Sequence, residues 1–213
     1  WDVYNSSLFE IRKISVEGNR EVKKGDILRR AGVRPGMSLV RISAGEIRDR
    51  IEKEPWIRDV RVVKEYPDKL RLIVSERKPL VSLRVGSAVF IVDKDGYVWK
   101  NSGKDRVLPE IRDLPVLKVE IGKRLKAKEL KNALLCVGSM DRNIYELVVS
   151  LSAASVEGLT LQLSNGVLVS YGKATKTAKK NYVLGLILSQ AHLKGEKLQR
   201  IDVRIASHPV INR

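Results

Sequence analysis

The stretch from Glu54 to Pro79 restricts the fold more than any other part of the chain. Two runs in it alternate apolar with polar residues, with the apolar positions at Val60 and Val62 in the first and at Leu70, Leu72 and Val74 in the second. Between the runs lies Tyr66-Pro67-Asp68-Lys69, in which proline restricts a turn φ angle and aspartate can bond its own backbone. Period-two alternation on both sides of a turn predicts a β-hairpin with one buried face.

Upstream of this hairpin, the sequence predicts one strand and two helices. From Phe9, apolar residues alternate through Ile14 and Val16 until Gly18-Asn19, which indicates a strand followed by a turn. Ile27, Leu28 and Ala31 give a short helix that ends at Gly32. The order is therefore strand, helix, helix, strand, strand, and it is complete by about residue 78.

The second helix has a capping box at Ser43-Ala44-Gly45-Glu46, with Ser43 as the N-cap. Ile47 and Ile51 form one apolar stripe behind it, and the helix closes before Pro55. We expect Trp56, just after that proline, to lie in the core between this helix and the sheet.

A chain of 213 residues suffices for one large domain or two small ones. No apolar run approaches the roughly 20 residues that a membrane helix needs. The single cysteine, Cys136, excludes a disulfide framework and a thiolate zinc site, and its apolar helical surroundings indicate a buried structural thiol.

The net charge is +16, with +6 on residues 1–79 and +10 on residues 80–213. The densest basic runs are Lys123-Arg124-Lys126-Lys128 and Lys173-Lys176-Lys179-Lys180. Such a surface favours nucleic acid, anionic lipid headgroups or acidic partners. Aromatic residues, which nucleic-acid readers use for stacking, make up only 5% of the chain. We therefore expect a solvated basic surface that tolerates an anionic membrane, and no nucleic acid.

In the second half, Phe90 to Trp99 predicts two strands around an Asp-Gly turn. Asp93 and Asp95 suggest calcium, but the segment lacks the third acidic position and the distal glutamate of a calcium loop. Leu108-Pro109 and Leu114-Pro115 follow in a predicted loop.

A helix is then expected from Ala127 to Val137, followed by strands around Leu161 and Val169 that are joined by an Asn165-Gly166 turn. A long helix fits Thr175 to His192, with Ala178, Tyr182, Val183, Leu186 and Ile187 facing inward. Ile201 to Arg204 begins the last predicted strand.

Enzyme activity finds little support in the motifs. Neither His192 nor His208 has a motif around a candidate serine, and no GxSxG, HExxH or phosphate-binding loop occurs. We expect no catalytic, metal-binding or cofactor-binding residues and no small-molecule substrate.

Four pieces in this order resemble the POTRA domain of the bacterial division family FtsQ/DivIB: Ile14-Ser15-Val16-Glu17-Gly18-Asn19, Pro55-Trp56-Ile57, Tyr66-Pro67-Asp68-Lys69-Leu70 and Glu76-Arg77-Lys78-Pro79. The second half resembles the β-domain of the same family. The resemblance implies an α+β chain, with a POTRA domain (β-α-α-β-β) at 1–79, including a juxtamembrane linker at 1–10. A β-rich domain with a mainly antiparallel sheet and flanking helices follows at 80–213. Trp1 and Tyr4 in the linker resemble the aromatic flank of a membrane span.

The resemblance also implies a function. FtsQ-like proteins are non-enzymatic scaffolds that hold FtsB and FtsL and, through them, the septal synthase FtsW with FtsI. A membrane helix preceding residue 1 would place this region outside the cytoplasmic (inner) membrane, on the periplasmic side at the division septum. Two alternatives remain open: a POTRA module of an outer-membrane insertion or secretion machine, and a basic nucleic-acid-binding protein.

The expected partner site is the terminal strand from Val203 to Ile211, because a final strand can lie at an open sheet edge. Asp202 and Arg204 resemble the closing motif of the family, and Ile205 replaces its usual tyrosine. We expect Arg204 to meet an acidic residue of the partner, Ile205 to give apolar contact, and pairing to be interrupted around His208-Pro209. The expected contact residues are Val203, Arg204, Ile205, Ala206, Ser207, Val210 and Ile211.

Overall fold

The computed structural model describes residues 7–100, 108–116 and 118–213. The chain divides into two compact units, Trp1–Arg77 and Lys78–Arg213. Trp1 and Tyr4, which resemble the aromatic flank of a membrane span, lie outside the described residues.

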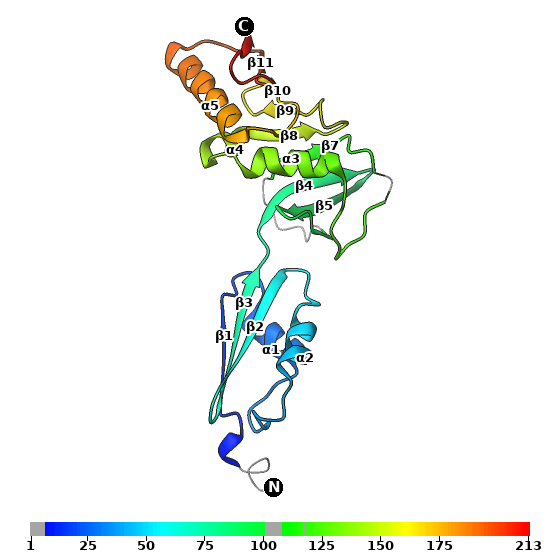
Figure 1. Cartoon of the computed structure of the whole chain (residues 1–213), viewed down its shortest axis with the longest axis vertical. Helices are drawn as coiled ribbons and strands as arrows, with labels where there is room; N and C mark the ends of the chain where they lie inside the picture. The colour runs from blue at the N-terminus through cyan, green and yellow to red at the C-terminus, as the bar shows by residue number, and fades with distance from the viewer. Residues whose placement is uncertain (1–6, 101–107, 117) are drawn as a thin grey trace. The chain divides into compact units, whose positions relative to one another are not determined.

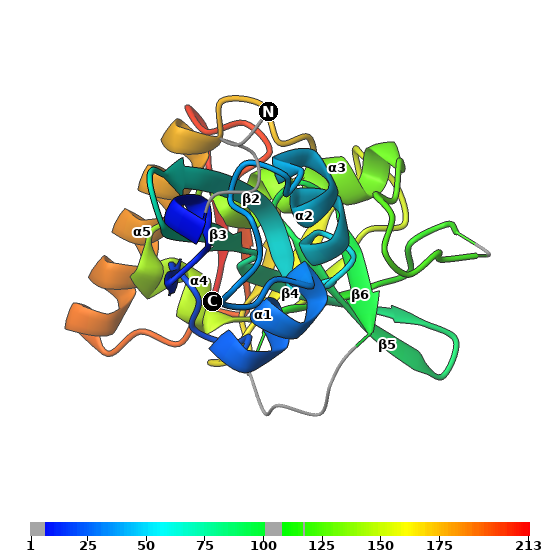
Figure 2. The same cartoon turned by 90° about the horizontal axis from the view of Figure 1, so that it is seen from below.

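The first unit has the predicted order of elements. A 3-10 turn at Ser7–Phe9 is followed by β1 (Lys13–Glu17), α1 (Lys24–Ala31), α2 (Ala44–Ile51), β2 (Ile57–Glu65) and β3 (Lys69–Glu76). The sheet order is β1-β3-β2, with β1 parallel and β2 antiparallel to the central β3. Both helices lie on one side of the sheet (Figures 1 and 2). The predicted POTRA architecture is therefore confirmed.

Local signals in the sequence account for these elements. The apolar positions of the hairpin face the helices, where Val60, Leu70 and Leu72 are buried. Ser43 Oγ accepts a hydrogen bond from the Glu46 backbone N–H at 3.3 Å, which is the expected N-cap. Trp56 differs from our expectation: it is only partly buried and packs at the border of the core, whereas the next residue, Ile57, is fully buried.

The second unit is built on a nine-stranded sheet. Its strands are β4 (Pro79–Val85), β5 (Ala88–Asp93), β6 (Val98–Lys100), β7 (Glu110–Arg112), β8 (Val148–Ser152), β9 (Thr160–Leu163), β10 (Leu168–Ser170), β11 (Arg200–Asp202) and β12 (Val210–Asn212). The sheet order is β12-β11-β10-β9-β8-β7-β4-β5-β6. Of the eight pairings, five are antiparallel and three are parallel, so the sheet is mainly antiparallel, as expected.

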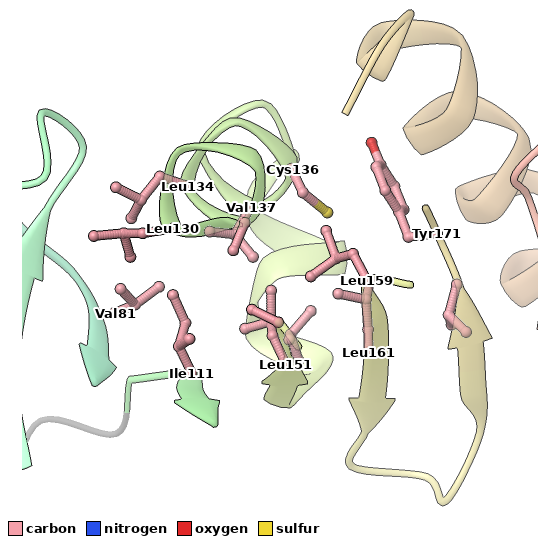
Figure 3. Packing of buried hydrophobic residues seen from close by; sticks show 14 of the residues in the cluster. Val81, Ile111, Leu130, Leu134, Cys136, Val137, Leu151, Leu159, Leu161 and Tyr171 are labelled. Atoms are coloured by element: carbon pink, nitrogen blue, oxygen red, sulfur yellow. The ribbon is translucent and has the colours of Figure 1, made fainter. Parts of the chain in front are cut away.

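Helices α3 (Lys128–Gly138), α4 (Arg142–Leu147) and α5 (Thr177–Lys194) accompany this sheet (Figure 1). Figure 3 shows α3 lying across the strands, where Leu130 and Val137 meet Ile111 and Leu151. Cys136 points from α3 toward Tyr171 and is fully buried, as predicted. Burial raises the pKa of its thiol far above the ordinary value, so Cys136 is an inert core residue.

Strand β7 corrects the predicted loop between Leu108 and Pro115. Glu110–Arg112 pairs in parallel with β4 on one side and with β8 on the other, so it lies inside the sheet. Three residues are too short for a period-two signal, and their partners are distant in sequence. The helix α4 and the strand β8 also escaped sequence-based prediction.

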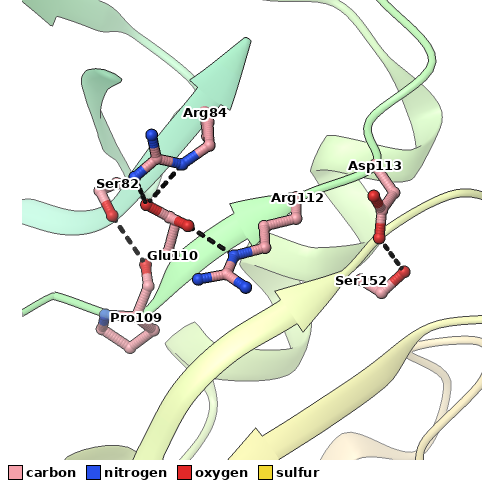
Figure 4. Close-up of polar contacts among 7 residues, drawn as sticks. All are labelled: Ser82, Arg84, Pro109, Glu110, Arg112, Asp113 and Ser152. Carbon is pink, nitrogen blue, oxygen red and sulfur yellow. Dashed lines mark hydrogen bonds and ion pairs between the residues drawn. The ribbon is translucent and has the colours of Figure 1, made fainter. Parts of the chain in front are cut away.

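The face of β7 opposite the core carries an ionic cluster (Figure 4). Arg84 donates two hydrogen bonds to Glu110 Oε2, at 2.7 and 3.1 Å, and Arg112 donates to Glu110 Oε1. The hydrogen bond from Arg84 lowers the pKa of the Glu110 carboxyl, and Arg112 adds to this effect. The cluster thus ties the short β7 to its neighbour β4.

The face of α5 that packs on the sheet differs in part from the predicted one. Val183 and Ile187 pack against the core, as expected. Ala178, Tyr182 and Leu186 are exposed, whereas Lys180 and Asn181 are buried. The reason is that both polar side chains find partners inside: Lys180 Nζ donates to the carbonyl oxygens of two residues that follow β10, at 2.7 and 2.8 Å. The Tyr171 hydroxyl donates to Asn181 Oδ1 at 2.9 Å. A polar side chain whose hydrogen bonds are all made inside the protein can be buried at low cost. Lys180 and Asn181 can therefore lie on the side of α5 that faces the sheet.

Burial also changes the role of Lys180, which we had placed on the solvated basic surface. Its ammonium lies 4.9 Å from the centre of the Tyr171 ring, and burial lowers its pKa. Lys180 is therefore a structural residue that holds the segment after β10 against α5.

Candidate partner-binding edge

The two ends of the nine-stranded sheet, β6 and β12, differ in how far they are covered. Residues 122–125 run along β6: Val98 N–H donates to the Lys123 carbonyl at 2.9 Å, and Leu125 N–H donates to the Gly96 carbonyl at 2.9 Å. Gly122 N–H in turn donates to the Val98 carbonyl at 2.8 Å. These bonds occupy backbone groups that an edge strand otherwise offers to another chain.

The strand β12 is the open end. It pairs with β11 in the register Arg200↔Asn212, Ile201↔Ile211 and Asp202↔Val210. Among residues 7–100, 108–116 and 118–213, no strand pairs with its outer side. Val210 is 60% exposed and Ile211 is 41% exposed. An open edge with apolar side chains on it is a template for adding a strand from a partner.

The prediction of a strand from Val203 to Ile211, interrupted only around His208-Pro209, is wrong, because the chain forms a hairpin there. β11 ends at Asp202, residues 203–209 form the connection, and β12 begins at Val210. Val203 is fully buried, with its N–H donating to the Ser170 carbonyl at 3.0 Å. Pro209 lies immediately before β12, where its missing N–H removes no bond from the ladder with β11.

Arg204, which we expect to meet a carboxylate of the partner, has an acidic neighbour within its own hairpin. The Arg204 guanidinium donates to Asp202 Oδ2 at 2.6 Å from Nη2 and at 2.9 Å from Nε, and Nε also donates to Oδ1 at 3.1 Å. The Arg204 backbone N–H donates to Asp202 Oδ1 at 2.9 Å. These hydrogen bonds lower the pKa of Asp202. Asp202 and Arg204 therefore shape the turn that returns the chain to the edge.

The remaining predicted contact residues lie in the turn. Ile205 is 65% exposed, Ser207 is exposed and Ala206 is partly buried. The structure therefore places Val210 and Ile211 on the edge strand, Ile205 and Ser207 beside it in the connection, and Val203 in the core. Asn212, on the edge as well, was missed, because a three-residue strand gives no periodic signal.

Within the part of the chain that the structure describes, other kinds of site find no support. They contain no group of three or more His, Cys, Asp and Glu side chains arranged to hold a metal ion. None of their helices combines the length and the apolar character that crossing a membrane requires. Ser207 Oγ lies 3.0 Å from His208 Nδ1, but the two are sequence neighbours in an exposed turn. His192 is exposed near the end of α5.

The fold combines an amino-terminal POTRA unit with a mixed-sheet unit that ends in an open edge. Comparison with known proteins agrees with this class. Residues 9–77 match the family described as POTRA domain, FtsQ-type. Residues 83–204 match the family described as cell division protein FtsQ/DivIB, C-terminal. The chain therefore belongs to the FtsQ/DivIB family of cell division proteins.

Individual relatives bear the same names. The cell division protein FtsQ of Syntrophotalea carbinolica is 30% identical over 215 residues, which cover 98% of this chain and 76% of that protein. FtsQ of Mycobacteroides abscessus is 27% identical, over 88% of this chain and 58% of that protein. DivIB of Clostridium botulinum is 25% identical, over 95% of this chain and 81% of that protein.

Proposed function

We propose that this chain is the extracytoplasmic part of a divisome scaffold that binds FtsB-type and FtsL-type partners and links them to septal peptidoglycan synthesis by an FtsW/FtsI-type synthase. A helix preceding residue 1 would anchor it in the cytoplasmic membrane at the septum. In this proposal the protein acts by binding and carries out no catalysis. Family membership supports a role in cell division. The open edge strand β12 is the observation that supports binding of a partner strand.

The binding mode is strand addition at β12. Backbone hydrogen bonds to an extended segment supply affinity, while side chains on alternate faces supply specificity. Val210 and Ile211 stand next to each other, so they project to opposite faces of the strand and can contact the partner on both. The opposite sheet end is a poorer acceptor because residues 122–125 already bond to the segment around β6.

The test replaces Val210 and Ile211 separately with Glu and measures binding to a synthetic FtsB-type segment from the same organism by isothermal titration calorimetry. Leu193→Glu is the matched control, because Leu193 is an apolar residue on α5 that is 82% exposed. We expect each edge variant to lose at least about tenfold in affinity, since a desolvated charge at an interface is costly. The control should bind within about twofold of the unchanged protein.

All three variants should melt like the unchanged protein, because their side chains are substantially exposed. Normal binding by both edge variants would place the site elsewhere, and the edges of the POTRA sheet would then be the next surface to test. Loss of binding in the Leu193 variant as well would show a general effect of added charge.

A further inference from the structure

A basic groove in the second unit lies on α3, apart from the edge strand β12. It has a volume of about 760 Å³ and is lined by the turn after β5, by residues 124–128 and by the outer face of α3. Its cationic side chains are Lys94, Arg124, Lys126, Lys128 and Lys131. We call this feature the α3 groove.

Backbone bonds hold one wall of the α3 groove in place. The antiparallel bridge between Tyr97 and Arg124, together with the bond from Leu125 N–H to the Gly96 carbonyl, fixes the segment that carries Arg124 and Lys126. The basic run that begins at Lys123 is therefore presented from an ordered segment. A preordered surface binds a ligand with less loss of conformational entropy.

The positive charge in the α3 groove is largely uncompensated. Lys94 is paired with Asp95 at 2.9 Å, and Lys128 lies 4.0 Å from Glu129. Arg124, Lys126 and Lys131 have no ion pair with any described residue, and Asp95 is the only acidic side chain among the described residues that line the groove. Gathering like charges without counterions is unfavourable, which a bound anion relieves.

The second basic run of the sequence reaches the same part of the molecule. Lys173 pairs with Glu157 at 2.9 Å, and the charge of Lys128 on α3 also lowers the pKa of the Glu157 carboxyl, after the larger effect of Lys173. Asn132 on α3 accepts a hydrogen bond from the Ala174 N–H at 2.7 Å. The fold thus brings together two runs that are far apart in the sequence.

The floor of the α3 groove is apolar. Leu125, Leu130 and Leu134 line it, and Leu135 is 51% exposed beside them. Lys128, Lys131 and Leu135 follow one another at helical spacings of three and four, so they form one stripe on α3. A ligand that fits this stripe carries negative charges and apolar side chains together.

Three other occupants fit these observations less well. A second copy of this chain carries a charge of +16 and would be repelled. A nucleic acid would lack stacking partners, because the described residues that line the groove include no aromatic side chain. A bilayer is flat, whereas the leucines lie in a recess between charged side chains. An acidic peptide segment satisfies both the charges and the recess.

We propose that the α3 groove is a second docking site, which binds an acidic, leucine-containing segment of a partner protein. It is separate from the edge strand, so one chain can hold a strand at β12 and an acidic segment at α3. Charged rim residues speed the encounter and set specificity, and the leucines slow dissociation.

The test uses fluorescence anisotropy of a labelled peptide of repeated Glu-Glu-Leu against the full 213-residue chain. Peptides with Gln for Glu and with Ser for Leu serve as matched probes. The groove variant is Lys126→Glu with Lys131→Glu, and its control is Lys194→Glu with Lys197→Glu, which changes the net charge equally outside the groove lining. A third variant, Leu135→Gln, removes exposed apolar surface and leaves the charge unchanged.

We expect the groove variant to weaken binding of the acidic peptide about thirtyfold and the control less than threefold. Leu135→Gln should weaken it about fivefold, and both altered peptides should bind more weakly than the parent. Val210→Glu should leave this binding unchanged, which separates this proposal from the one at β12.

Equal losses in the groove variant and its control would overturn the proposal, because they would show a general attraction to basic surface. The same holds if the acidic peptide does not bind. Tighter binding of a single-stranded oligonucleotide or of phosphatidylglycerol vesicles, lost in the groove variant, would assign the α3 groove to another class of ligand.

Discussion

The side chain of Glu76 closes the loop between β1 and α1, and its removal gives the sharpest test of how the POTRA unit is held together. Glu76 Oε1 accepts hydrogen bonds from the backbone N–H groups of Arg20 and Val22, each at 2.9 Å. Glu76 Oε2 accepts from the Glu21 N–H at 2.9 Å. One carboxylate at the end of β3 therefore satisfies three consecutive donors, and Val22 behind them is a core residue.

The expected cost follows from these bonds. A hydrogen bond to a charged group contributes about 1.5–3 kcal/mol, and bonds that share one acceptor are not additive. We expect Glu76→Ala to destabilise the unit by about 3 kcal/mol. Glu76→Gln keeps one carbonyl oxygen, which in the place of Oε1 can accept from all three N–H groups, including that of Glu21 at 3.1 Å. It loses the charge and the shorter bond from the Glu21 N–H to Oε2. Its cost should be about 1–1.5 kcal/mol.

Hydrogen exchange followed by mass spectrometry measures this effect in the full chain. In the segment of residues 18–24, Glu76→Ala should speed exchange about a hundredfold, since each 1.4 kcal/mol corresponds to a factor of about ten. Glu65→Ala is the matched control on the same hairpin. Glu65 pairs with Arg71 at 2.9 Å on the surface, where such pairs contribute about 0–1 kcal/mol.

An unchanged exchange rate in the Glu76→Ala variant would refute this reasoning. It would mean that the three N–H groups find other acceptors or water at no cost. Equal exchange rates in the Glu76→Ala and Glu65→Ala variants would also count against it. They would show that the Glu76 carboxylate contributes no more than an exposed surface charge.

Four further predictions concern the stability of the two units. Gly18→Ala should destabilise the POTRA unit by more than about 3 kcal/mol in urea unfolding, because φ is +84° and a Cβ would lie 2.1 Å from the Val74 carbonyl oxygen. Glu110→Gln should lower the melting temperature at neutral pH and have no effect at low pH: the folded-state pKa is depressed, so this stabilisation is lost as pH falls through it. Trp56→Ala should cost about 1–3 kcal/mol, less than a fully buried tryptophan, and melting unchanged while partner binding weakens would contradict this. A fragment of residues 1–79 should unfold cooperatively, and a broad, uncooperative transition would show that it depends on the rest of the chain.

The POTRA unit was predictable because its signals are local. The alternation in β2 and β3, the turn between them and the Ser43 cap each involve neighbours along the chain. In contrast, the cost of losing Glu76 was not visible, because its three donors lie more than fifty residues away along the chain, at sequence separations of 54 to 56. In the sequence, Glu76 stands out only as the first residue of the motif Glu76-Arg77-Lys78-Pro79.

The candidate binding surfaces depended on the tertiary structure. Which strand forms an open edge follows from the order of pairing along the whole sheet, and β12 lies at its end only because the chain turns back after Asp202. The α3 groove likewise forms only because the fold brings the turn after β5 against residues 124–128 and α3.

The family, the order of elements in the POTRA unit and the basic character of the chain were predictable without a structure, since they follow from local motifs, periodicity, turn chemistry and composition. Tertiary structure decided that Lys180 is buried, that Arg204 is already paired and that β7 lies inside the sheet. The physical reason is the same in each case. A polar side chain or a three-residue strand takes its place from partners that are remote in sequence, and no pattern within the segment specifies those partners.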